Sequence, residues 1–436
     1  MEILRGLFGI IVLLGIAFLF SVNRKKIDWR LVGIGVFLQV TFGFLVTNVP
    51  AIRDMFYIIS KGFVTLLSFS EDGAEFLFGD LARNSDANPE LRHGLGFIFA
   101  FQVLPTVIFF STVSAGLYYL GVLQKVVFGI AWIMAKTMRL SGPESLSAAG
   151  NIFLGQTEAP LLVRPFVSKM TKSEIMCLMT GGMATIAGGV LAAYVSFLGG
   201  PDPVEKAKFA SFLLSASIMN APAGIVISKM LIPETKDIEK EDLSVNKDKI
   251  GVNLIDALAN GASDGVKLAL NIGGMLLAFI AIIYLLNYIF SNLIGNWIGV
   301  NALIITSTNG LFDGLTLQYI LGQAFRPLAF IMGVPWADSL AVGSLLGQKT
   351  VINEFVAYLD LSALKSEGAL SPKAIVISTF ALCGFSNFSS IAIQIGGIGA
   401  MAPNQQSTLS ELGMKALLGA TIACMMTGTI AGAFVI

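Results

Sequence analysis

The sequence predicts an all-α integral membrane protein. Of its 436 residues, 55% are hydrophobic and 13% are charged, whereas a soluble domain carries about 25% charged residues. Apolar runs of about 18 residues or more recur along the chain, which is the length that spans a bilayer as a helix. The runs are continuous and do not alternate with a period of two, so spanning helices are expected rather than spanning strands.

The composition also excludes several classes of function. The formal net charge is zero, which gives no basic surface for a nucleic acid. The three cysteines, Cys177, Cys383 and Cys424, are scattered through apolar runs and show neither metal-ligand spacing nor a disulfide framework. The only histidine, His93, lies in a polar loop, which argues against histidine-based catalysis. An enzyme is therefore not expected.

Hydropathy predicts about eight spans. Arg24, Lys25, Lys26 and Arg30 follow the first apolar run, so this loop is expected in the cytoplasm and both termini outside. The segment 51–81 mixes apolar and charged residues, which suits a helix at the membrane interface. The segments 80–93 and 233–249 are predicted to be polar loops. The predicted spans cover about 3–20, 31–49, one span after a short helix within 95–138, 175–198, 209–231, 266–294, one from about 374, and 416–436.

Two further segments are long enough to enter the membrane but are interrupted in the middle by glycine and polar residues. These are 141–168 and 335–361. Backbone that is not helical is tolerated at membrane depth only where it is buried in protein or lines a water-filled cavity. We therefore expect two re-entrant helical hairpins whose tips meet inside the bilayer.

The two hairpin segments resemble each other. LGQTEAPLLV begins at Leu154 and LGQKTVINEFVAYL begins at Leu346, and each is followed by a span with a polar or glycine-rich interruption, GGMATIAGG at 181–189 and CGFSNFSS at 383–390. In the predicted orientation, the first hairpin enters the membrane from the cytoplasmic side and the second enters it from the outside. The two segments therefore form an inverted repeat, with broken helices at the midplane of the membrane. Such paired breaks indicate the binding site of a secondary transporter, although chance similarity of a few residues is the alternative.

Glu158 and Glu354 are the clearest functional candidates, because a carboxylate inside a membrane is costly unless it is paired or hydrated. The alternative for both is a structural ion pair with Arg164, Lys169 or Lys349. The polar residues near the breaks are also functional candidates, but each has a structural alternative. At the first hairpin tip the alternative is helix capping, and in the second break it is hydrogen bonding between helices. These residues are Asn151, Gln156, Thr157, Ser386, Asn387, Ser389 and Ser390.

Five further residues have their own interpretations. Thr185 and Ile186 lie where a helix is expected to unwind, and a hydroxyl with free carbonyls suits a sodium ion. Phe385, on composition alone, reads as packing. Asp313 and Asp338 are expected at the interface and are assigned no role.

The motifs GNIFLGQTEAPLLV, MATIAGGVLAAY, PLAFIMGVPWAD with LLGQKTVINEFVAYLDL, and GFSNFSSIAIQIGGIGAMAP closely resemble the concentrative nucleoside transporters. The resemblance runs from about residue 95 to the C-terminus, with the motifs in the same order, and the length resembles the bacterial form. It implies a secondary transporter in the bacterial plasma (inner) membrane that imports nucleosides, such as uridine, by symport with sodium. Proton coupling stays open, because Thr185 stands where some relatives carry serine.

The resemblance also implies roles for residues and segments. Residues 1–140 and 233–334 would form largely the scaffold of a homotrimer, and 141–232 and 335–436 the two repeats of a transport domain that moves against it. The nucleoside site would comprise Gly155, Gln156, Thr157, Glu158, Val190, Glu354, Phe385, Asn387 and Ser390. The sodium site would comprise Asn151, Leu154, Thr185 and Ile186.

Without the resemblance, the residues allow three other functional hypotheses. A carrier for carboxylates or amino acids should show arginine or free helix N-termini at the tips, where this chain has acidic and amide groups. An intramembrane hydrolase needs a nucleophile and a base, and no G-x-S-x-G elbow is present. A channel can also contain an inverted repeat with two hairpins, and only accumulation against a gradient separates it from a carrier.

Overall fold

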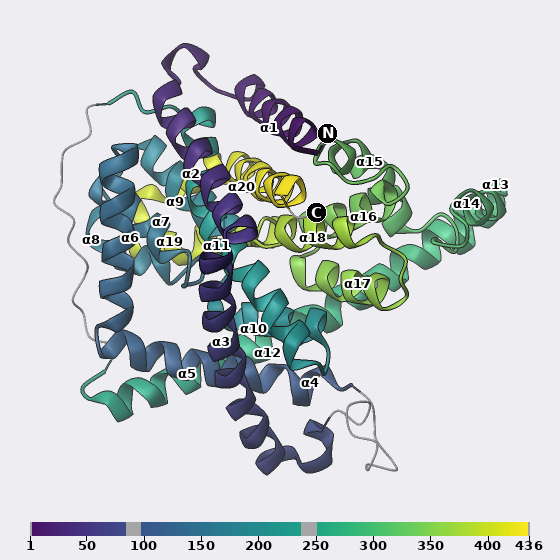
Figure 1. The fold of residues 1–436 in the computed structure, drawn as a ribbon, viewed down its shortest axis with the longest axis horizontal. Helices are drawn as coiled ribbons and strands as arrows, with labels where there is room; N and C mark the ends of the chain where they lie inside the picture. Colours follow the sequence, from purple (N-terminus) through teal and green to yellow (C-terminus); the bar gives the residue numbers. More distant parts are fainter. Residues whose placement is uncertain (1, 84–96, 237–250, 435–436) are drawn as a thin grey trace.

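The computed structural model describes residues 2–83, 97–236 and 251–434, and these residues form helices, turns and no strands. His93 and nearly all of the charged segment 233–249 lie outside the described residues, so the loops predicted there are not tested. The prediction of an all-α chain is confirmed for the part that the structure describes. Figure 1 shows long helices gathered around a central group that contains α11, α18 and α20.

The N-terminal helices follow the predicted pattern. α1 spans Glu2–Leu19, α2 spans Trp29–Asn48 and α3 spans Pro50–Phe78. The Asp28 carboxylate caps α2 by accepting hydrogen bonds from the backbone N–H groups of Arg30 and Leu31. α3 is one continuous helix in the segment where an interfacial helix is expected.

The segment 95–138 differs from its prediction. We expected a short helix followed by one span that ends near Lys136, but two helices of similar length follow the short helix. They are separated at Gly121, which adopts a positive φ of 74° that glycine tolerates without strain. The three elements are α4 (Phe99–Gln102), α5 (Leu104–Tyr119) and α6 (Val122–Met138).

The first repeat contains a hairpin, a broken helix and a long helix. The helix α7 enters the hairpin behind a capping box formed by Ser141 and Glu144, and the return arm is irregular. Residues 185–187 interrupt the next span between α9 and α10. The bounds are α7 Gly142–Gly150, η4 Ala159–Val163, α8 Arg164–Val167, α9 Lys172–Ala184, α10 Gly188–Gly199 and α11 Pro203–Leu231.

The second repeat has the same order of elements. Both arms of its hairpin are regular helices, and residues 382–387 interrupt the next span. The long helix α20 corresponds to α11, against which it packs. The bounds are α16 Ser339–Val351, α17 Glu354–Ser366, α18 Pro372–Ala381, α19 Phe388–Met401 and α20 Gln406–Phe434, and α15 (Leu317–Ile331) precedes the repeat.

The Leu-Gly-Gln triplets of the two hairpins are not structurally equivalent. The triplet at Leu154 lies in the irregular tip, whereas the triplet at Leu346 lies inside α16. The glutamates do correspond, because Glu158 and Glu354 each stand at the start of a return arm. The extra residues between Gln348 and Glu354 extend the first arm of the second hairpin.

A separate long helix connects the repeats. α12 spans Leu254–Asn287, which begins about three turns earlier than the span predicted from residue 266. It continues through the π-helical segment Tyr288–Gly295 into α13 (Asn296–Ile298), and α14 (Asn301–Ser307) follows. Figure 1 shows α13 and α14 projecting from the rest of the molecule, and α12 packs along α5.

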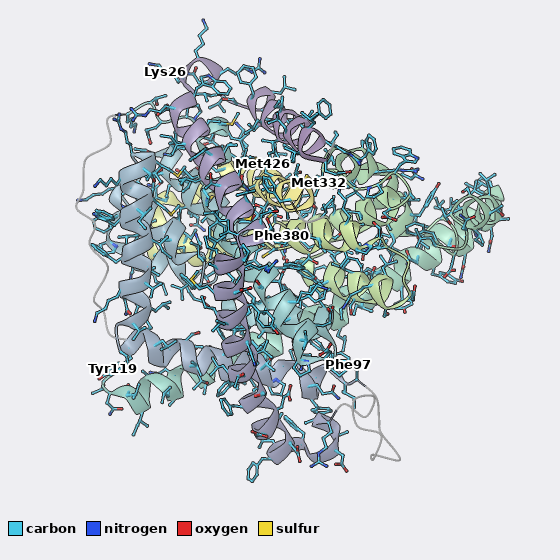
Figure 2. All side chains as sticks on the ribbon, viewed as in Figure 1. Lys26, Phe97, Tyr119, Met332, Phe380 and Met426 are labelled. Carbon is cyan, nitrogen blue, oxygen red and sulfur yellow. The ribbon has the colours of Figure 1, made fainter. Side chains whose placement is uncertain are left out.

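The buried core lies between the two repeats. Met332, Phe380 and Met426 sit deep in it, whereas Lys26 and Tyr119 lie at the periphery, as Figure 2 shows. The first broken segment is almost wholly buried: 94% of the most apolar window of α9–α10 is inside the protein, against 22% for the corresponding window of α12. The repeats therefore form the interior, and α12 presents much of its surface to the surroundings.

Seven helical segments of the described chain are long and apolar enough to cross a membrane. α18 and α19 are shorter apolar helices that together would form a further, broken crossing. The count of about eight spans and the membrane entry of the two hairpins stay predictions.

Candidate functional site

The tip of the first hairpin is held against the broken helix of its own repeat. The backbone N–H of Gly188, at the start of α10, donates to the Phe153 carbonyl over 3.1 Å. The Ser217 hydroxyl of α11 donates to the Ile152 carbonyl over 2.9 Å. These bonds satisfy carbonyl groups that the irregular tip leaves free, so the tip can be both non-helical and buried.

Asn151 is the most unusual polar residue at this tip. Its side chain is 1% exposed, and within the part of the chain that the structure describes neither its amide oxygen nor its amide nitrogen has a hydrogen-bond partner. The amide lies against α9, because a Cβ added at Gly181 would stand 3.2 Å from the Asn151 Nδ2. A buried amide with both groups unpaired is costly, which indicates a site that a ligand completes.

The other predicted sodium ligands lie in or beside the same region. Thr185 and Ile186, both 1% exposed, form the break between α9 and α10. The Thr185 hydroxyl donates to the Gly181 carbonyl over 2.9 Å, which leaves its oxygen lone pairs free to coordinate. Leu154 belongs to the tip that docks on this break. The donor set of amide, hydroxyl and carbonyl oxygens suits a hard cation.

The residues predicted to face the nucleobase occupy two environments. Gln156 is buried, donates from Nε2 to the Ser390 hydroxyl over 3.0 Å, and keeps an unpartnered Oε1. Glu158 is exposed and lines a cavity of about 370 Å³ between the hairpin, α5, α10 and α12. Thr157 is half-buried and packs near Gly397 of α19, and Val190 is buried in α10.

Gly155 has a local structural reason to be glycine. Its backbone N–H donates to the Glu158 carboxylate, and a Cβ at this position would stand 2.8 Å from the Glu158 Oε2. A larger residue at this position would therefore displace the Glu158 carboxylate, which lines the cavity.

The residues predicted to hold the ribose form one buried cluster. The Glu354 carboxylate accepts a hydrogen bond from the Asn387 Nδ2 over 2.8 Å. Asn387 in turn accepts, at Oδ1, from the Ser390 backbone N–H over 2.9 Å and from the Ser389 hydroxyl over 2.7 Å. Phe385 is half-buried in the same break and packs against the core.

A continuous hydrogen-bonded path therefore joins the two hairpins. It runs from Gln156 at the first tip to Ser390 and Asn387 of the second broken helix, and then to Glu354 at the second tip. Glu158 is not in this path: it lines the adjacent cavity, of which Glu354 is not a lining residue. The structure joins Gln156, Glu354, Asn387 and Ser390 of the predicted nucleoside site by hydrogen bonds, and it sets Glu158 at their edge, on the side that faces α12.

The ion-pair alternative is not supported for either glutamate. Within the described residues, neither Glu158 nor Glu354 forms a salt bridge. Lys349 instead donates to the Ala381 carbonyl over 2.8 Å, at the end of α18. Glu354 is 2% exposed and is stabilised by neutral hydrogen-bond donors.

Three residues near the site were missed by the sequence analysis. The Tyr194 hydroxyl of α10 donates to the Glu354 Oε1 over 2.9 Å. Gln394 follows Ser390 by one turn of α19, donates to the Met179 carbonyl over 3.1 Å, and keeps a buried, unpartnered Oε1. Thr180 of α9 also has an unpartnered hydroxyl. For Gln394, a glutamine in an otherwise apolar span was the available signal.

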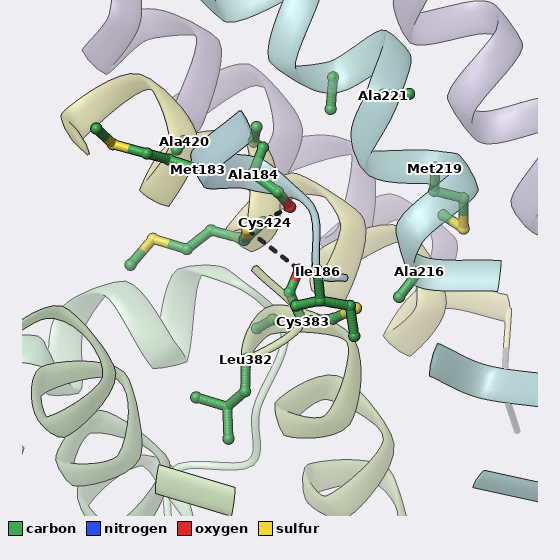
Figure 3. Packing of buried hydrophobic residues seen from close by; sticks show 14 of the residues in the cluster. Met183, Ala184, Ile186, Ala216, Met219, Ala221, Leu382, Cys383, Ala420 and Cys424 are labelled. Atoms are coloured by element: carbon green, nitrogen blue, oxygen red, sulfur yellow. Dashed lines mark hydrogen bonds between the residues drawn. The ribbon is translucent and has the colours of Figure 1, made fainter. Parts of the chain in front are cut away.

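The two broken helices meet directly. The Phe385 backbone N–H donates to the Thr185 carbonyl over 3.2 Å. The Cys424 thiol of α20 bridges the carbonyls of Ala184 and Cys383, as Figure 3 shows, at 3.4 Å and 3.5 Å. The predicted cation region and the predicted ribose region therefore share one junction.

Comparison with known families assigns the chain. The models described as the N-terminus and the C-terminus of Na⁺ dependent nucleoside transporters match residues 8–81 and 212–432, and a model described as nucleoside recognition matches residues 100–201. The chain belongs to the concentrative nucleoside transporter family. The resemblance seen in the sequence motifs is thereby confirmed.

Relatives and solved structures agree with this assignment. The chain is 38% identical to the nucleoside permease NupC of Helicobacter pylori, covering 99% of this chain and 98% of that protein. It is 38% identical to the mouse sodium/nucleoside cotransporter 1, covering 99% of this chain and 64% of that longer protein. An inward-facing, substrate-bound structure of CNTnw is 42% identical, with a TM-score of 0.88 and full coverage of both chains.

An outward-facing structure of a CNTnw variant matches equally well, with 41% identity, a TM-score of 0.89, and coverage of 100% of this chain and 98% of the other. These relatives are transporters, which confirms the prediction that this member of the concentrative nucleoside transporter family is not an enzyme. It is an integral membrane transporter.

Proposed function

We propose that the chain imports nucleosides, such as uridine, by symport with sodium across the inner membrane of a bacterium. One observation carries the proposal: the path from Gln156 through Ser390 and Asn387 to Glu354 joins both hairpins, and within the described residues the buried Gln156 Oε1 on this path has no hydrogen-bond partner. A nucleoside is neutral and rich in donors and acceptors. Amides, hydroxyls and one carboxylate are the groups that such a solute requires.

The proposed roles follow from the chemistry of each group. Glu354 would accept hydrogen bonds from the ribose hydroxyls, and bonds to an ionised acceptor are stronger than neutral ones. Tyr194 and Asn387 hold its two oxygens in place. Gln156, Thr157 and Glu158 would face the nucleobase, with Gly155 and Val190 shaping the tip. Phe385 and Ser390 would complete the site.

Sodium would bind between Asn151, Leu154, Thr185 and Ile186. The support is the fully unpartnered amide of Asn151, which lies beside the break between α9 and α10. An ion at this position would order the tip that carries Gln156 and Glu158. Because coupling between two binding sites is reciprocal, sodium would strengthen nucleoside binding and the nucleoside would strengthen sodium binding by the same factor.

Alternating access would use movement of the two repeats, 141–232 and 335–436, against the scaffold formed by 1–140 and 233–334. The cavity beside Glu158 supports this division, because its walls come from the first repeat on one side and from α5 and α12 on the other. In the proposed homotrimer, scaffolds would meet through apolar faces such as that of α12, which exposes Leu270, Leu277 and Leu285. A monomeric mass by native mass spectrometry in detergent would contradict the trimer.

The transport proposal is tested by radiolabelled uridine uptake into proteoliposomes with an inward sodium gradient, an inward proton gradient, or neither. Sodium alone is expected to drive accumulation above the external concentration. The Glu354→Gln variant is expected to lose most uptake while staying monodisperse, and Glu411→Gln, at an exposed ion pair with Lys172, serves as the matched control. Uptake that ignores both gradients would contradict symport.

A further inference from the structure

The first halves of the two broken helices end differently. Within the part of the chain that the structure describes, the carbonyls of Gly182 and Met183, in the last turn of α9, accept no hydrogen bond. In the last turn of α18, by contrast, every carbonyl of residues 378–381 accepts one. The carbonyls that end α9 are therefore left free, whereas those that end α18 are satisfied by the chain itself.

Lys349 supplies one of the bonds that complete α18. Its ammonium donates to the Ala381 carbonyl over 2.8 Å, and the side chain is 1% exposed. It forms no salt bridge with any residue that the structure describes. The carboxyl end of a helix carries partial negative charge and is stabilised by a cation. The buried ammonium is therefore placed where α18 favours positive charge.

Lys349 and Asn151 occupy corresponding places in the two repeats. Asn151 caps the end of α7, the first arm of the first hairpin, and its amide lies against α9. Lys349 lies in the last turn of α16, the first arm of the second hairpin, and its ammonium contacts the end of α18. Each hairpin thus presents one polar side chain to a half-helix of its own repeat. In the first repeat this group is an amide without a partner among the described residues, and in the second it is a cation.

We propose that the Lys349 ammonium does in the second repeat what the coupling ion does in the first. It is a built-in cation that keeps the second hairpin joined to the end of α18 whether or not sodium is bound. Lys349 is thereby a positioning residue for Glu354, which follows at the start of α17. The inference rests on the proposed function, because it takes the sodium region around Asn151 as its reference.

The two halves of the nucleoside site are therefore prepared in different ways. The tip that carries Asn151 and Gln156 becomes ordered only when an ion from solution occupies the free carbonyls beside it. The second tip, with Glu354, is ordered in advance, because its cation is covalently attached to the chain. Sodium then controls one half of the site, and the other half is constant.

Hydrogen–deuterium exchange of the full chain in nanodiscs, in sodium chloride and in choline chloride at equal ionic strength, compares the two halves directly. Sodium is expected to slow exchange at residues 151–158 and 184–188 and to leave exchange at residues 349–354 and 382–387 unchanged. Equal slowing of both pairs of segments would contradict the proposal. Slowing at neither pair would contradict the proposed sodium site instead, and the Lys349 variants would then decide the role of the lysine.

The Lys349→Ala variant removes the built-in cation and leaves space for a small one. The uridine dissociation constant, measured in sodium chloride, is expected to rise about tenfold or more, since a hydrogen bond from a charged group is lost. Exchange should become faster at residues 382–387 but not at 184–188. Propylammonium chloride, which replaces the deleted atoms, should reverse both effects, and the bulkier tetramethylammonium chloride should not.

Two further variants complete the test. Lys349→Met removes the charge but fills the space, so it should show the same loss without rescue by propylammonium. Lys365→Ala is the matched control, because Lys365 also donates to a carbonyl near a helix end, that of Leu198 at 2.7 Å, but does so at the protein surface beside Glu205. Its uridine dissociation constant should not change.

The proposal is overturned if Lys349→Ala binds uridine as tightly as the unaltered chain, or if propylammonium fails to restore binding in a monodisperse sample. Faster exchange at both breaks would show general destabilisation and would also contradict the positioning role. If Lys349→Ala is not monodisperse, Lys349→Met decides: unchanged uridine binding, or unchanged exchange at residues 382–387, would refute the role of the ammonium.

Discussion

Glu354 is an ionisable residue buried in an apolar bundle, and it forms no salt bridge with any residue that the structure describes. Two neutral donors, the Tyr194 hydroxyl and the Asn387 amide, each hold one of its oxygens, and the side chain stands at the N-terminus of α17, where the helix dipole favours negative charge. This arrangement fixes the position of the carboxylate and leaves remaining lone pairs for other donors. The two hydroxyls of a ribose are donors of the required kind.

Replacement of Tyr194 by phenylalanine tests this positioning role. The change removes one hydrogen bond to a charged group, worth about 1.5–3 kcal/mol, and keeps the ring. We expect the KM for uridine to rise about tenfold or more, measured by initial uptake rates in proteoliposomes. Tyr358→Phe is the matched control, because Tyr358 is equally buried and stacks on Tyr194 but donates to the Thr379 carbonyl. Equal KM changes in both variants would contradict the role of Tyr194.

Individual residues show how far the sequence alone could lead. Glu158, Glu354 and Asn387 were identifiable because polar side chains interrupt apolar runs. Tyr194 was not, because a tyrosine in an apolar helix is usually a packing residue, and only the fold brings it to Glu354. Nor could the sequence show that Lys349 bonds a helix-end carbonyl and leaves Glu354 unpaired as an ion.

At the scale of elements, the site depends on close contact between the two broken helices. Gly384 makes this contact possible, because a Cβ there would stand 2.6 Å from both the Ala184 carbonyl oxygen and the Cys424 sulfur. The contact distance leaves no room for a methyl group. The breaks thus bring their free backbone groups to one junction.

Gly384→Ala is therefore expected to destabilise the protein by about 1–3 kcal/mol, the usual cost of overpacking a core, and to lower uridine uptake. Gly396→Ala is the control, since nothing lies within 4 Å of a Cβ at that helical position, and alanine favours a helix over glycine. Thermal unfolding in detergent measures the difference. A melting temperature for Gly384→Ala at or above that of Gly396→Ala would contradict the close contact.

The first hairpin is also anchored at its base. The Glu144 carboxylate in α7 forms a buried salt bridge with Lys229 of α11, and the Lys229 ammonium also donates to the Ser173 hydroxyl over 3.0 Å. Both charged side chains are nearly inaccessible, at 0% and 6% exposure. Breaking a buried pair leaves an uncompensated charge, which costs more than removing both partners.

A double-mutant cycle at this pair tests the anchor. Lys229→Met and Glu144→Gln are each expected to lower the free energy of unfolding by about 3–5 kcal/mol. The double variant should lose less than the sum of the two single losses, as measured by chemical denaturation in mixed micelles. Additive losses would show that the two side chains do not interact.

The sequence predicted most helices and breaks, but not which part of a hairpin each motif occupies. Helix lengths and breaks follow from apolar runs and glycine, so α1, α2, α11 and the break at Thr185 lie close to their predicted positions. The match of the Leu-Gly-Gln triplets was misleading, because one triplet lies in a tip and the other inside α16. A local identity of three residues does not specify which part of a hairpin it occupies, whereas the start of a return arm is set by packing.

At the scale of the whole molecule, the two repeats place an ion region and a nucleoside region at one buried junction. Asn151 and Thr185 stand on one side of the contact between the broken helices, and Asn387 and Ser390 stand on the other. The tip that carries Asn151 also carries Gln156, which bonds Ser390. An ion that orders this tip would prepare the nucleoside site, and this coupling is the central claim.

The most direct test is the dissociation constant of uridine for the purified protein, measured by titration calorimetry in sodium chloride and in choline chloride at equal ionic strength. Coupling energies between sites are typically about 1–3 kcal/mol, so sodium should tighten uridine binding by about 5- to 150-fold. The Asn151→Leu variant should lose this dependence. A uridine dissociation constant that is the same in both salts would contradict the account.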